Sequence, residues 1–579
     1  MAKISKTLNI LRPRMLSGKL AIPLLILLTI CVFSRPAIAE TSIYVFDPKQ
    51  STVFRSGGIA GLQKTFSVAS QFRLTVDPDA GVASFETVDA NLIDENGSVY
   101  GQSLNEIFNI TGLVGTIIDD TTIEFGGKTA DGTESDVILK LSFREDSAHL
   151  TGKTTPPPNS ADMFFYEIDA VAIKKYAGGT GEPNDPYQIA TAEDLMLLGD
   201  SPEDYGKHFI LTADIDLDPN LPGRKVFDRA VVAPDVNDLA EGFQGTAFTG
   251  VFDGFGHTIS HLMIVGDSCL GLLGELGSVG SGGEVRDLGV ADVNIAGSGG
   301  FVGGLVGYNY ASTVSRCYST GTVSGNEGVG GLVGFKDGAV TRCYSTCAVS
   351  GIEGIGGLVG SSRSGVMIEC YSAGAVSGGS MVGGLLGGSG IKSAVTDCYS
   401  TATVSGIESV GGLVGSNNGG RIATSYCIGL VSARENVGGL VGNTGAPYVG
   451  VYQSFWDIQT SCQTTSVGGT GKTTAEMQTA STFLEAGWDF VDESANGTED
   501  IWSICEGTNY PRFLWQIAAG DFVCPDGITI DDFMFFLEHW LDDNCNLSND
   551  YCQGTDLDQS GTVDVIDLEI FFEIWSAEN

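Results

Sequence analysis

A six-residue phrase recurs along the middle of the chain at nearly constant spacing. VGGLVG begins at Val302, Val329, Val410 and Val437, and the close variants IGGLVG and VGGLLG begin at Ile355 and Val382. The leucines of the six copies lie 27, 26, 27, 28 and 27 residues apart: Leu305, Leu332, Leu358, Leu385, Leu413 and Leu440. A fixed period of this length is typical of stacked structural units, none of which can bury its apolar face alone.

The sequence between the copies of the phrase favours β-strands. It is short, rich in β-forming residues, broken by glycine and free of any ten-residue helical pattern. About 27 residues allow three short strands and three turns, which is one circuit of a β-solenoid. We expect the leucine and valine side chains to point into a narrow core. Each should stack on the equivalent side chain of the next turn. The glycines should adopt turn conformations and let adjacent backbones approach closely. A phosphate-binding loop is disfavoured, because no helix start or nearby lysine follows the phrase.

A second phrase, CYS followed by a small residue, runs in phase with the first. It places cysteines at equivalent positions: Cys317, Cys343, Cys370 and Cys398. Equivalent positions in stacked turns form a straight line, whereas zinc requires a tetrahedron of ligands. We therefore predict a column of buried thiols rather than a metal site or disulfides. The fifth copy agrees, since Ser425 stands where a cysteine is expected.

These phrases resemble the GLUG-motif repeats of bacterial secreted and surface proteins. The resemblance extends from about Tyr176 to Gln516 and includes GVFDGFGHTISHLMI upstream and SFWDIQTSCQTTSVGGTGKTTAEMQ downstream. It implies a parallel, right-handed β-helix and no agreed activity. Some members are attached to IgA-cleaving peptidases, but the HExxH zinc signature of those enzymes is absent from this chain. Independently of the family, the sequence from Thr191 to Leu198 predicts a capped helix over the open end of the solenoid.

The first 39 residues have the pattern of a secretory signal. Six basic residues accompany the apolar run from Ala21 to Phe33. The small-residue pattern Ala37-Ile38-Ala39, typical of a cleavage site, follows. We expect cleavage between Ala39 and Glu40 and a secreted, extracellular or cell-surface location, with no transmembrane segment in the mature chain. Twelve cysteines then remain, in a compartment that permits disulfides.

The formal net charge of −41 is distributed unevenly. Residues 311–445 carry seven acidic and seven basic side chains, whereas residues 520–579 carry fifteen acids and no lysine or arginine. Binding of nucleic acid is disfavoured, because it requires clustered basic residues. Strong acidity suits a chain that binds a cation. An extracellular glycan is a further candidate ligand, although an acidic surface repels anionic polysaccharides unless calcium bridges the charges.

The segment from Glu40 to Lys175 lacks the repeat. Apolar residues alternate with polar ones over 137–143 and 164–168, and turn signals separate these runs. This pattern predicts an antiparallel β-sandwich or barrel.

The segment DLDQSGTVDVID has the spacing of a calcium-binding loop. Oxygen ligands fall at loop positions 1, 3, 5, 7, 9 and 12, with Gly561 at position 6, where the chain must turn sharply. The predicted ligands are Asp556, Asp558, Ser560, Thr562 (through its carbonyl), Asp564 and Asp567. A helix-like segment follows, with Leu568, Phe571, Phe572 and Trp575 on one face.

This loop and helix resemble the type I dockerin repeat, in which the twelfth position is also Asp. The resemblance implies calcium binding and a cohesin-like or cell-surface partner. Dockerins carry two repeats, and the candidate first copy is Cys524 to Trp540. It is one residue short and lacks acids at the places of Asp556 and Asp558, so calcium binding at this copy is left open. Disulfides are expected here, with their connectivity open among four cysteines: Cys505, Cys524, Cys545 and Cys552.

Two segments contain candidate catalytic residues. GGTGKTT, residues 468–474, is interpreted as a turn before a short helix, because a required glycine of the phosphate loop is replaced by Ser466. Asp253, His257 and His261 suggest acid–base chemistry, but neither a nucleophile nor a third partner is evident.

The chain is therefore predicted to be mainly β and modular. The expected divisions are a signal (1–39), a β-sandwich or barrel (40–175), a solenoid N-terminal cap with the first coils (176–300), the repeats (301–450), a C-terminal cap (451–516) and a small helical calcium-binding module (517–579). We predict a non-catalytic scaffold or adhesion protein, or a carbohydrate-associated binding protein. The alternative is a β-helix polysaccharide lyase or glycoside hydrolase acting on extracellular carbohydrate.

Overall fold

The computed structural model describes residues 40–578 except 47–50, 58–61, 78–81, 94–98, 104–106, 109–112, 120–121, 129–135, 145–146, 156–163, 238–241, 446–449, 492, 494–495, 498, 525–526 and 547–549. The expected signal, residues 1–39, lies outside the described residues. The chain divides into two compact units, residues 1–180 and 181–579. Within the described part of the chain, no helix is both long and apolar enough to span a bilayer.

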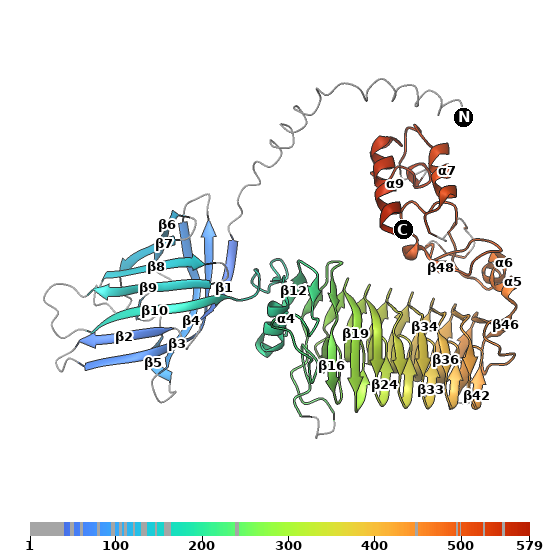
Figure 1. Cartoon of the computed structure of the whole chain (residues 1–579), viewed down its shortest axis with the longest axis horizontal. Coiled ribbons are helices and arrows are strands. Elements are labelled where there is room, and N and C mark those ends of the chain that lie inside the picture. Colours follow the sequence, from blue (N-terminus) through green and yellow to red (C-terminus); the bar gives the residue numbers. More distant parts are fainter. Residues whose placement is uncertain are drawn as a thin grey trace. The chain divides into compact units, whose positions relative to one another are not determined.

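The first unit is a closed antiparallel barrel rather than a sandwich (Figure 1). Its ring runs β3-β2-β10-β9-β8-β7-β6-β4, and β4 pairs back with β3. Strand β1 is added beside β3 and β10, and β5 beside β4. The strands are β1 (Glu40–Phe46), β2 (Thr52–Gly57), β3 (Leu62–Asp77), β4 (Val82–Ile93), β5 (Val99–Ser103), β6 (Val114–Asp119), β7 (Thr122–Lys128), β8 (Asp136–Arg144), β9 (Ser147–Thr155) and β10 (Phe164–Lys174).

Alternation along the strands fills the barrel interior. On β8, Val137, Leu139 and Leu141 are buried, while Ile138 is exposed. Phenylalanines from other strands meet them in one core, and the rings of Phe85 and Phe125 lie 4.6 Å apart. The interior is therefore packed with side chains over the described residues.

The second unit contains a parallel β-solenoid of about seven turns. The turns before Gly300 contribute strands to two sheets, and those from Gly300 onward to three; the strands stack side by side along the rod (Figure 1). Sheet 1 contains β11 (Tyr187–Ile189), β12 (His208–Leu211), β14 (Val251–Asp253), β17 (Leu273–Leu276), β18 (Glu284–Arg286), β21 (Val306–Asn309), β22 (Thr313–Ser315), β25 (Val333–Lys336), β26 (Ala339–Thr341), β30 (Val359–Ile368), β34 (Leu386–Thr396), β38 (Val414–Asn417), β39 (Arg421–Ala423), β43 (Val441–Asn443) and β44 (Gly450–Tyr452). Sheet 2 contains β13 (Ile215–Asp216), β15 (Thr258–Ser260), β16 (Met263–Gly266), β19 (Gly289–Gly297), β23 (Tyr318–Ser324), β27 (Tyr344–Ser345), β28 (Ala348–Ser350), β31 (Tyr371–Ser372), β32 (Ala375–Ser377), β35 (Tyr399–Ser400), β36 (Thr403–Ser405), β40 (Tyr426–Cys427), β41 (Val431–Ser432), β45 (Phe455–Asp457) and β46 (Thr470–Lys472). Sheet 3 contains β20 (Gly300–Val302), β24 (Glu327–Gly330), β29 (Glu353–Gly356), β33 (Ser380–Gly383), β37 (Glu408–Gly411) and β42 (Glu435–Gly438).

The repeated phrase forms the core of the solenoid. All six repeat leucines are fully buried, and the backbone N–H of each of the first five donates to the carbonyl of the next copy, as from Leu305 to Leu332 at 2.9 Å. The stacking of each leucine on its own copy is confirmed. The glycines of the phrase allow the backbones of adjacent turns to approach closely. A Cβ on Gly331 would clash with the carbonyl oxygen of Gly357 in the next turn. The left-handed turn lies just outside the phrase, at Gly328 and Gly354 (φ +60° and +67°).

Two further columns run along the solenoid. The predicted thiol column is confirmed, because Cys317, Cys343, Cys370 and Cys398 are buried and form no disulfide. Ser425 continues it, and its hydroxyl accepts the N–H of Cys398 at 3.1 Å. Beside the thiols, five tyrosine rings stack with centroids 4.8–5.1 Å apart and planes within 9° of parallel: Tyr318, Tyr344, Tyr371, Tyr399 and Tyr426.

Both ends of the solenoid carry caps. At the first turn, helix α4 (Ala192–Gly199) begins with the predicted capping box, in which Thr191 and Asp194 bond each other's backbone, and it is followed by η2 (Pro202–Asp204). At the last turn, an aromatic cluster around Trp488 and Trp502 packs on Tyr399 and Tyr426. The elements of this cap are α5 (Thr474–Met477), α6 (Ala480–Leu484), β47 (Trp502–Ser503), β48 (Arg512–Phe513) and η3 (Leu514–Gln516).

Candidate metal centre

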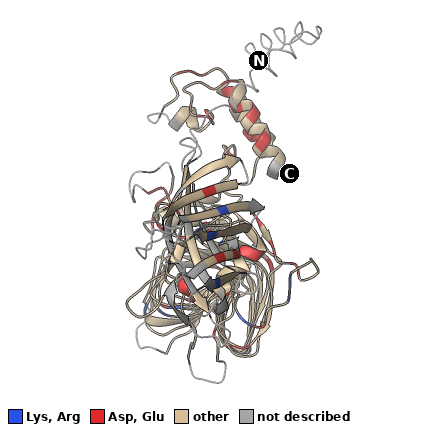
Figure 2. Cartoon of the chain, turned by 90° about the vertical axis from the view of Figure 1, so that its left-hand side faces the viewer, with Lys and Arg blue, Asp and Glu red and all other residues tan. Residues whose placement is uncertain are grey.

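The acidic loop predicted from the sequence lies in a small module after the C-terminal cap. Its helices are α7 (Ile530–Glu538), α8 (Asp550–Gln553) and α9 (Val565–Glu578), and α7 and α9 lie side by side (Figure 1). Phe536 and Phe571 join the two helices with ring centroids 5.4 Å apart. Figure 2 shows acidic residues along the helix that ends the chain. The module therefore combines an aromatic core with an acidic exterior.

Three carboxylates of the loop converge. One oxygen each from Asp556, Asp558 and Asp567 lies within 4.8 Å of the others, and Asp556 and Asp567 are buried. Backbone N–H groups hold them there. Asp556 accepts from Ser560 at 3.0 Å and from Gly561 at 2.9 Å.

The local sequence explains this geometry. Gly561 has φ +98°, a left-handed conformation that side chains disfavour, and this allows the chain to turn back over Asp556. Asp567 then closes the loop from the first turn of α9. Its carboxylate accepts the N–H of Asp558 at 3.0 Å and that of Asp564 at 2.8 Å.

The electrostatics of the cluster favour a cation. Burial raises the pKa of Asp556, and the nearby charge of Asp567 acts in the same direction. The hydrogen bond from Ser560 lowers the pKa of exposed Asp558, which keeps that carboxylate charged. Because the clustered donors are oxygens with negative charge, a hard divalent cation such as Ca²⁺ fits them.

The other three predicted ligands are arranged differently. The Ser560 hydroxyl donates to the carbonyl of Thr562 at 3.3 Å. These two groups therefore bond each other within the loop that carries the three clustered carboxylates. The carboxylate of Asp564 accepts the N–H of Ile566 at 2.8 Å and caps the start of α9. The structure thus brings together three of the six predicted ligand residues and places the other three around them.

A second loop repeats the contacts of the first, and here the sequence-based alignment was wrong. That alignment began the first copy at Cys524 and found no acid at the place of Asp556. In the structure Asp521 occupies this place, because its carboxylate accepts the N–H of Gly527 at 3.0 Å as Asp556 accepts that of Gly561. The glycine lies one residue later in this loop, which hid the match.

The far end of this loop matches as well. Asp532 accepts from Val523 at 2.9 Å and Thr529 at 2.8 Å, as Asp567 accepts from the corresponding positions of its own loop. Val523 stands where Asp558 lies in the second loop, so the first loop has one carboxylate fewer. The prediction that the first loop lacks an acid at the position equivalent to Asp558 is therefore confirmed.

The four cysteines around the module pair as Cys505–Cys524 and Cys545–Cys552. The first bond links the C-terminal cap to the first loop. The second closes the segment that precedes the acidic loop, where the N–H of Cys545 donates to the carbonyl of Gly561 at 3.1 Å. The bonds therefore anchor both loops.

The candidate catalytic residues of the solenoid do not form a common site. Asp253 accepts from Arg286 at 2.8 Å, His257 pairs with Asp214 at 3.1 Å, and His261 pairs with Asp216 at 2.8 Å. Each group is held by a different acid or base. The segment GGTGKTT contains strand β46 and ends at the first residue of the four-residue helix α5, which Thr473 caps. The short helix is confirmed, whereas a strand occupies the place of the predicted turn.

One feature of the solenoid surface was missed from the sequence. Glutamates at the first position of the sheet 3 strands lie in register and exposed: Glu327, Glu353, Glu408 and Glu435, with Ser380 in the middle. The signal was present, because each residue lies two positions before the valine or isoleucine of the phrase.

Comparison with known proteins identifies the repeats. Residues 298–324 and 378–405 match the family model described as the GLUG motif. Over 248 residues the chain is 30% identical to halomucin of Haloquadratum walsbyi (strain DSM 16790 / HBSQ001), a stretch that covers 42% of this chain and 2% of halomucin. The chain thus spans a small fraction of that relative's length.

Among solved structures, an IgA1 protease is similar at 11% identity and a TM-score of 0.33, covering 79% of this chain and 33% of that one. Since the TM-score is low, neither fold nor function is inferred from this similarity. The two motif matches and the regular turns together define the chain as a repeat protein whose β-solenoid contains GLUG motifs.

Proposed function

We propose that the protein is a secreted or cell-surface scaffold in which the solenoid acts as a spacer and the C-terminal module docks in a calcium-dependent way. The solenoid suits the role of a spacer, because the six repeat turns bond one another in the same way through the backbones of their leucines. The signal-like leader and the similarity to part of halomucin support an extracellular location.

The carboxylate cluster of Asp556, Asp558 and Asp567 carries the proposal for the module. Three negative charges within 4.8 Å repel one another, and a bound Ca²⁺ removes that cost while taking its remaining ligands from the loop and from water. Calcium would thereby fix the start of α9 against α7. The resemblance to dockerins adds the proposal that the ordered module docks on a cohesin-like or cell-surface protein.

Isothermal titration of the full mature chain with CaCl₂ tests this function. We expect binding by the wild-type protein and at least about tenfold weaker binding by Asp558→Asn, because one charged ligand is lost while its contact to Ser560 can remain. Glu573→Gln is the matched control, since it removes one exposed acid from α9 away from the cluster. Equal affinity for all three proteins would contradict the calcium site.

The row of glutamates in sheet 3 keeps the enzymatic alternative open. The strands that carry Glu327 and Glu353 are paired in register, and the strand spacing of about 4.8 Å is close to the carboxylate separation that retaining glycosidases use. We would incubate the chain with neutral and acidic polysaccharides and measure new reducing ends and unsaturated products. Turnover lost in Glu353→Gln would establish the enzyme. The absence of turnover on every substrate would favour the scaffold.

A further inference from the structure

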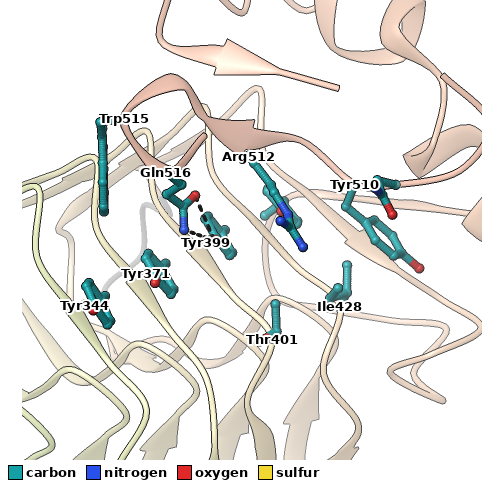
Figure 3. Close-up of a pocket in the computed structure, with 11 residues that line it drawn as sticks. Tyr344, Tyr371, Tyr399, Thr401, Ile428, Tyr510, Arg512, Trp515 and Gln516 are labelled. Atoms are coloured by element: carbon teal, nitrogen blue, oxygen red, sulfur yellow. Dashed lines mark hydrogen bonds between the residues drawn. The ribbon is translucent and has the colours of Figure 1, made fainter. Parts of the chain in front are cut away.

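A groove of about 580 Å³ lies where the C-terminal cap crosses the tyrosine column (Figure 3). Tyr344, Tyr371 and Tyr399 form one side, and the segment from Asn509 to Gln516 forms the other. This volume falls in the range of small-molecule sites, about 300–1,000 Å³. The groove is separate from the acidic loop and from the glutamate row.

The aromatic side of the groove presents ring edges and hydroxyls. Each tyrosine ring covers the face of the next, so the free parts of Tyr344 and Tyr371 are their edges. The Tyr399 hydroxyl is already bonded to the Gln516 carboxamide at 2.8–3.0 Å. By contrast, no described residue hydrogen-bonds the hydroxyl of Tyr344. Burial raises the pKa of Tyr344 to about 12, so this hydroxyl stays protonated and can donate to a ligand.

The opposite side supplies a guanidinium and an indole. Arg512 is exposed on β48, and its guanidinium forms no hydrogen bond or ion pair with any described residue. Its positive charge acts on Tyr371 and Tyr399, opposing the rise in pKa that burial produces there. Trp515 packs against Phe513, with planes 12° apart, and lines the groove beside Tyr371.

The positive charge in the lining of the groove favours an anionic ligand. Arg512 is the charged member of the eleven lining residues, and no acid is among them. In a chain of net charge −41, a guanidinium without an acidic partner is suited to an anionic group. Guanidinium binds carboxylate through two parallel hydrogen bonds. The other polar groups, hydroxyls and carboxamides, both donate and accept, as sugar hydroxyls do.

We propose that this groove binds an acidic oligosaccharide, with a uronic acid carboxylate on Arg512 and the apolar face of the sugar against Trp515. The hydroxyl of Tyr344 and the second N–H of the Gln516 carboxamide, whose first N–H bonds Tyr399, bond the sugar hydroxyls. This site lies outside the scaffold and calcium functions proposed above, and it adds glycan capture to them.

Calorimetric titration of the full mature chain with tri-galacturonate tests the site. The titration is run in excess EDTA, so that calcium bridging through the acidic module does not contribute. We expect binding of the acidic trisaccharide and not of neutral galactotriose. Arg512→Gln should weaken binding at least about tenfold, because a charge-assisted pair is lost. Arg434→Gln, a change of the same kind outside the groove, should leave it unchanged.

Trp515→Ala should also weaken binding, with circular dichroism as the check on its fold. Since Arg512 is exposed, its variant remains informative even if Trp515→Ala unfolds. Equal binding of both trisaccharides, full binding by Arg512→Gln, no binding by the wild type, or preference for a triglutamate peptide would each overturn the proposal.

Discussion

At the scale of single residues, the solenoid core depends on side chains that contact their own copies. Leu358 is fully buried between Leu332 and Leu385, whose backbones bond to its own. We predict that Leu358→Ala lowers the free energy of unfolding by about 2–5 kcal/mol, since it leaves a cavity that neighbouring turns cannot fill. Denaturant titration followed by circular dichroism measures the loss.

The nearby Ile352 provides the matched control for this prediction. It is 60% exposed, so Ile352→Ala should change the unfolding free energy by less than about 0.5 kcal/mol. Similar losses in both variants would show that the leucine column is not the source of stability.

The thiols provide a second residue-scale prediction. Among the described cysteines eight are free, and seven of these are buried while Cys462 is exposed. Burial raises the pKa of the Cys343 and Cys398 thiols, so the reactive thiolate is scarce there at neutral pH. Mass spectrometry after iodoacetamide treatment should find modification at Cys462 in the native chain and at all eight after denaturation. Rapid native labelling of the column would contradict its burial.

At the scale of elements, β17 carries a buried acid that makes its neighbourhood sensitive to pH. Glu275 is 8% exposed, and its Oε2 has no hydrogen-bond partner among the described residues. Burial raises its pKa to about 7, and Asp235, from the segment beside β17, adds to the rise. Tyr308 of β21 also faces it, and its own pKa is raised to about 12.

The sign of the effect follows from the direction of the pKa shift. The unfolded chain ionises Glu275 near its ordinary value of 4.5, whereas the folded chain keeps the proton up to about 7. Stability should therefore fall as pH rises through this window and stay low above it. We predict that Glu275→Gln removes this decline and stabilises the protein above the window by on the order of 2 kcal/mol. Unfolding midpoints across the pH range measure it, and an unchanged decline in the variant would refute the assignment.

At the scale of the whole molecule, the solenoid and the acidic module should respond differently to calcium. The module has its own core around Phe536 and Phe571, distinct from the aromatic cluster of the cap. We predict that EDTA lowers the melting temperature of the module and leaves that of the solenoid unchanged, because a ligand stabilises only the part that binds it. Scanning calorimetry with and without Ca²⁺ distinguishes the two transitions. An equal shift of both would show that they melt as one.

The same scale shows what the sequence could predict. The solenoid was predictable, because one period determines both the buried leucine and its partner in the next turn. The acidic loop was predictable too, since all six proposed ligand residues lie within twelve consecutive positions. In both cases the interacting residues are related by a constant spacing.

Features without constant spacing were left open or missed. The sequence left a sandwich and a barrel as alternatives for residues 40–175, and the barrel includes a short pairing of β4 with β6, where Val82 and Ala83 pair with Thr116 and Gly115. Asp521 was overlooked because its glycine lies one residue later than in the second loop. The groove depends on Tyr344 and Arg512, which are far apart in the sequence and line one groove only when the cap folds over the solenoid.

The uniform register of the turns also affects how such a chain can evolve. Each turn offers its neighbour the same carbonyls on one side and the same N–H groups on the other, as the leucine backbones show. Duplication or deletion of one repeat in the gene would leave both caps with unaltered docking surfaces. The distance between the ends of the solenoid would then change in steps of about 4.8 Å, one strand spacing at a time. The length of the solenoid would thus depend on the number of repeats in the gene. Recombination could change that number without changing the fold.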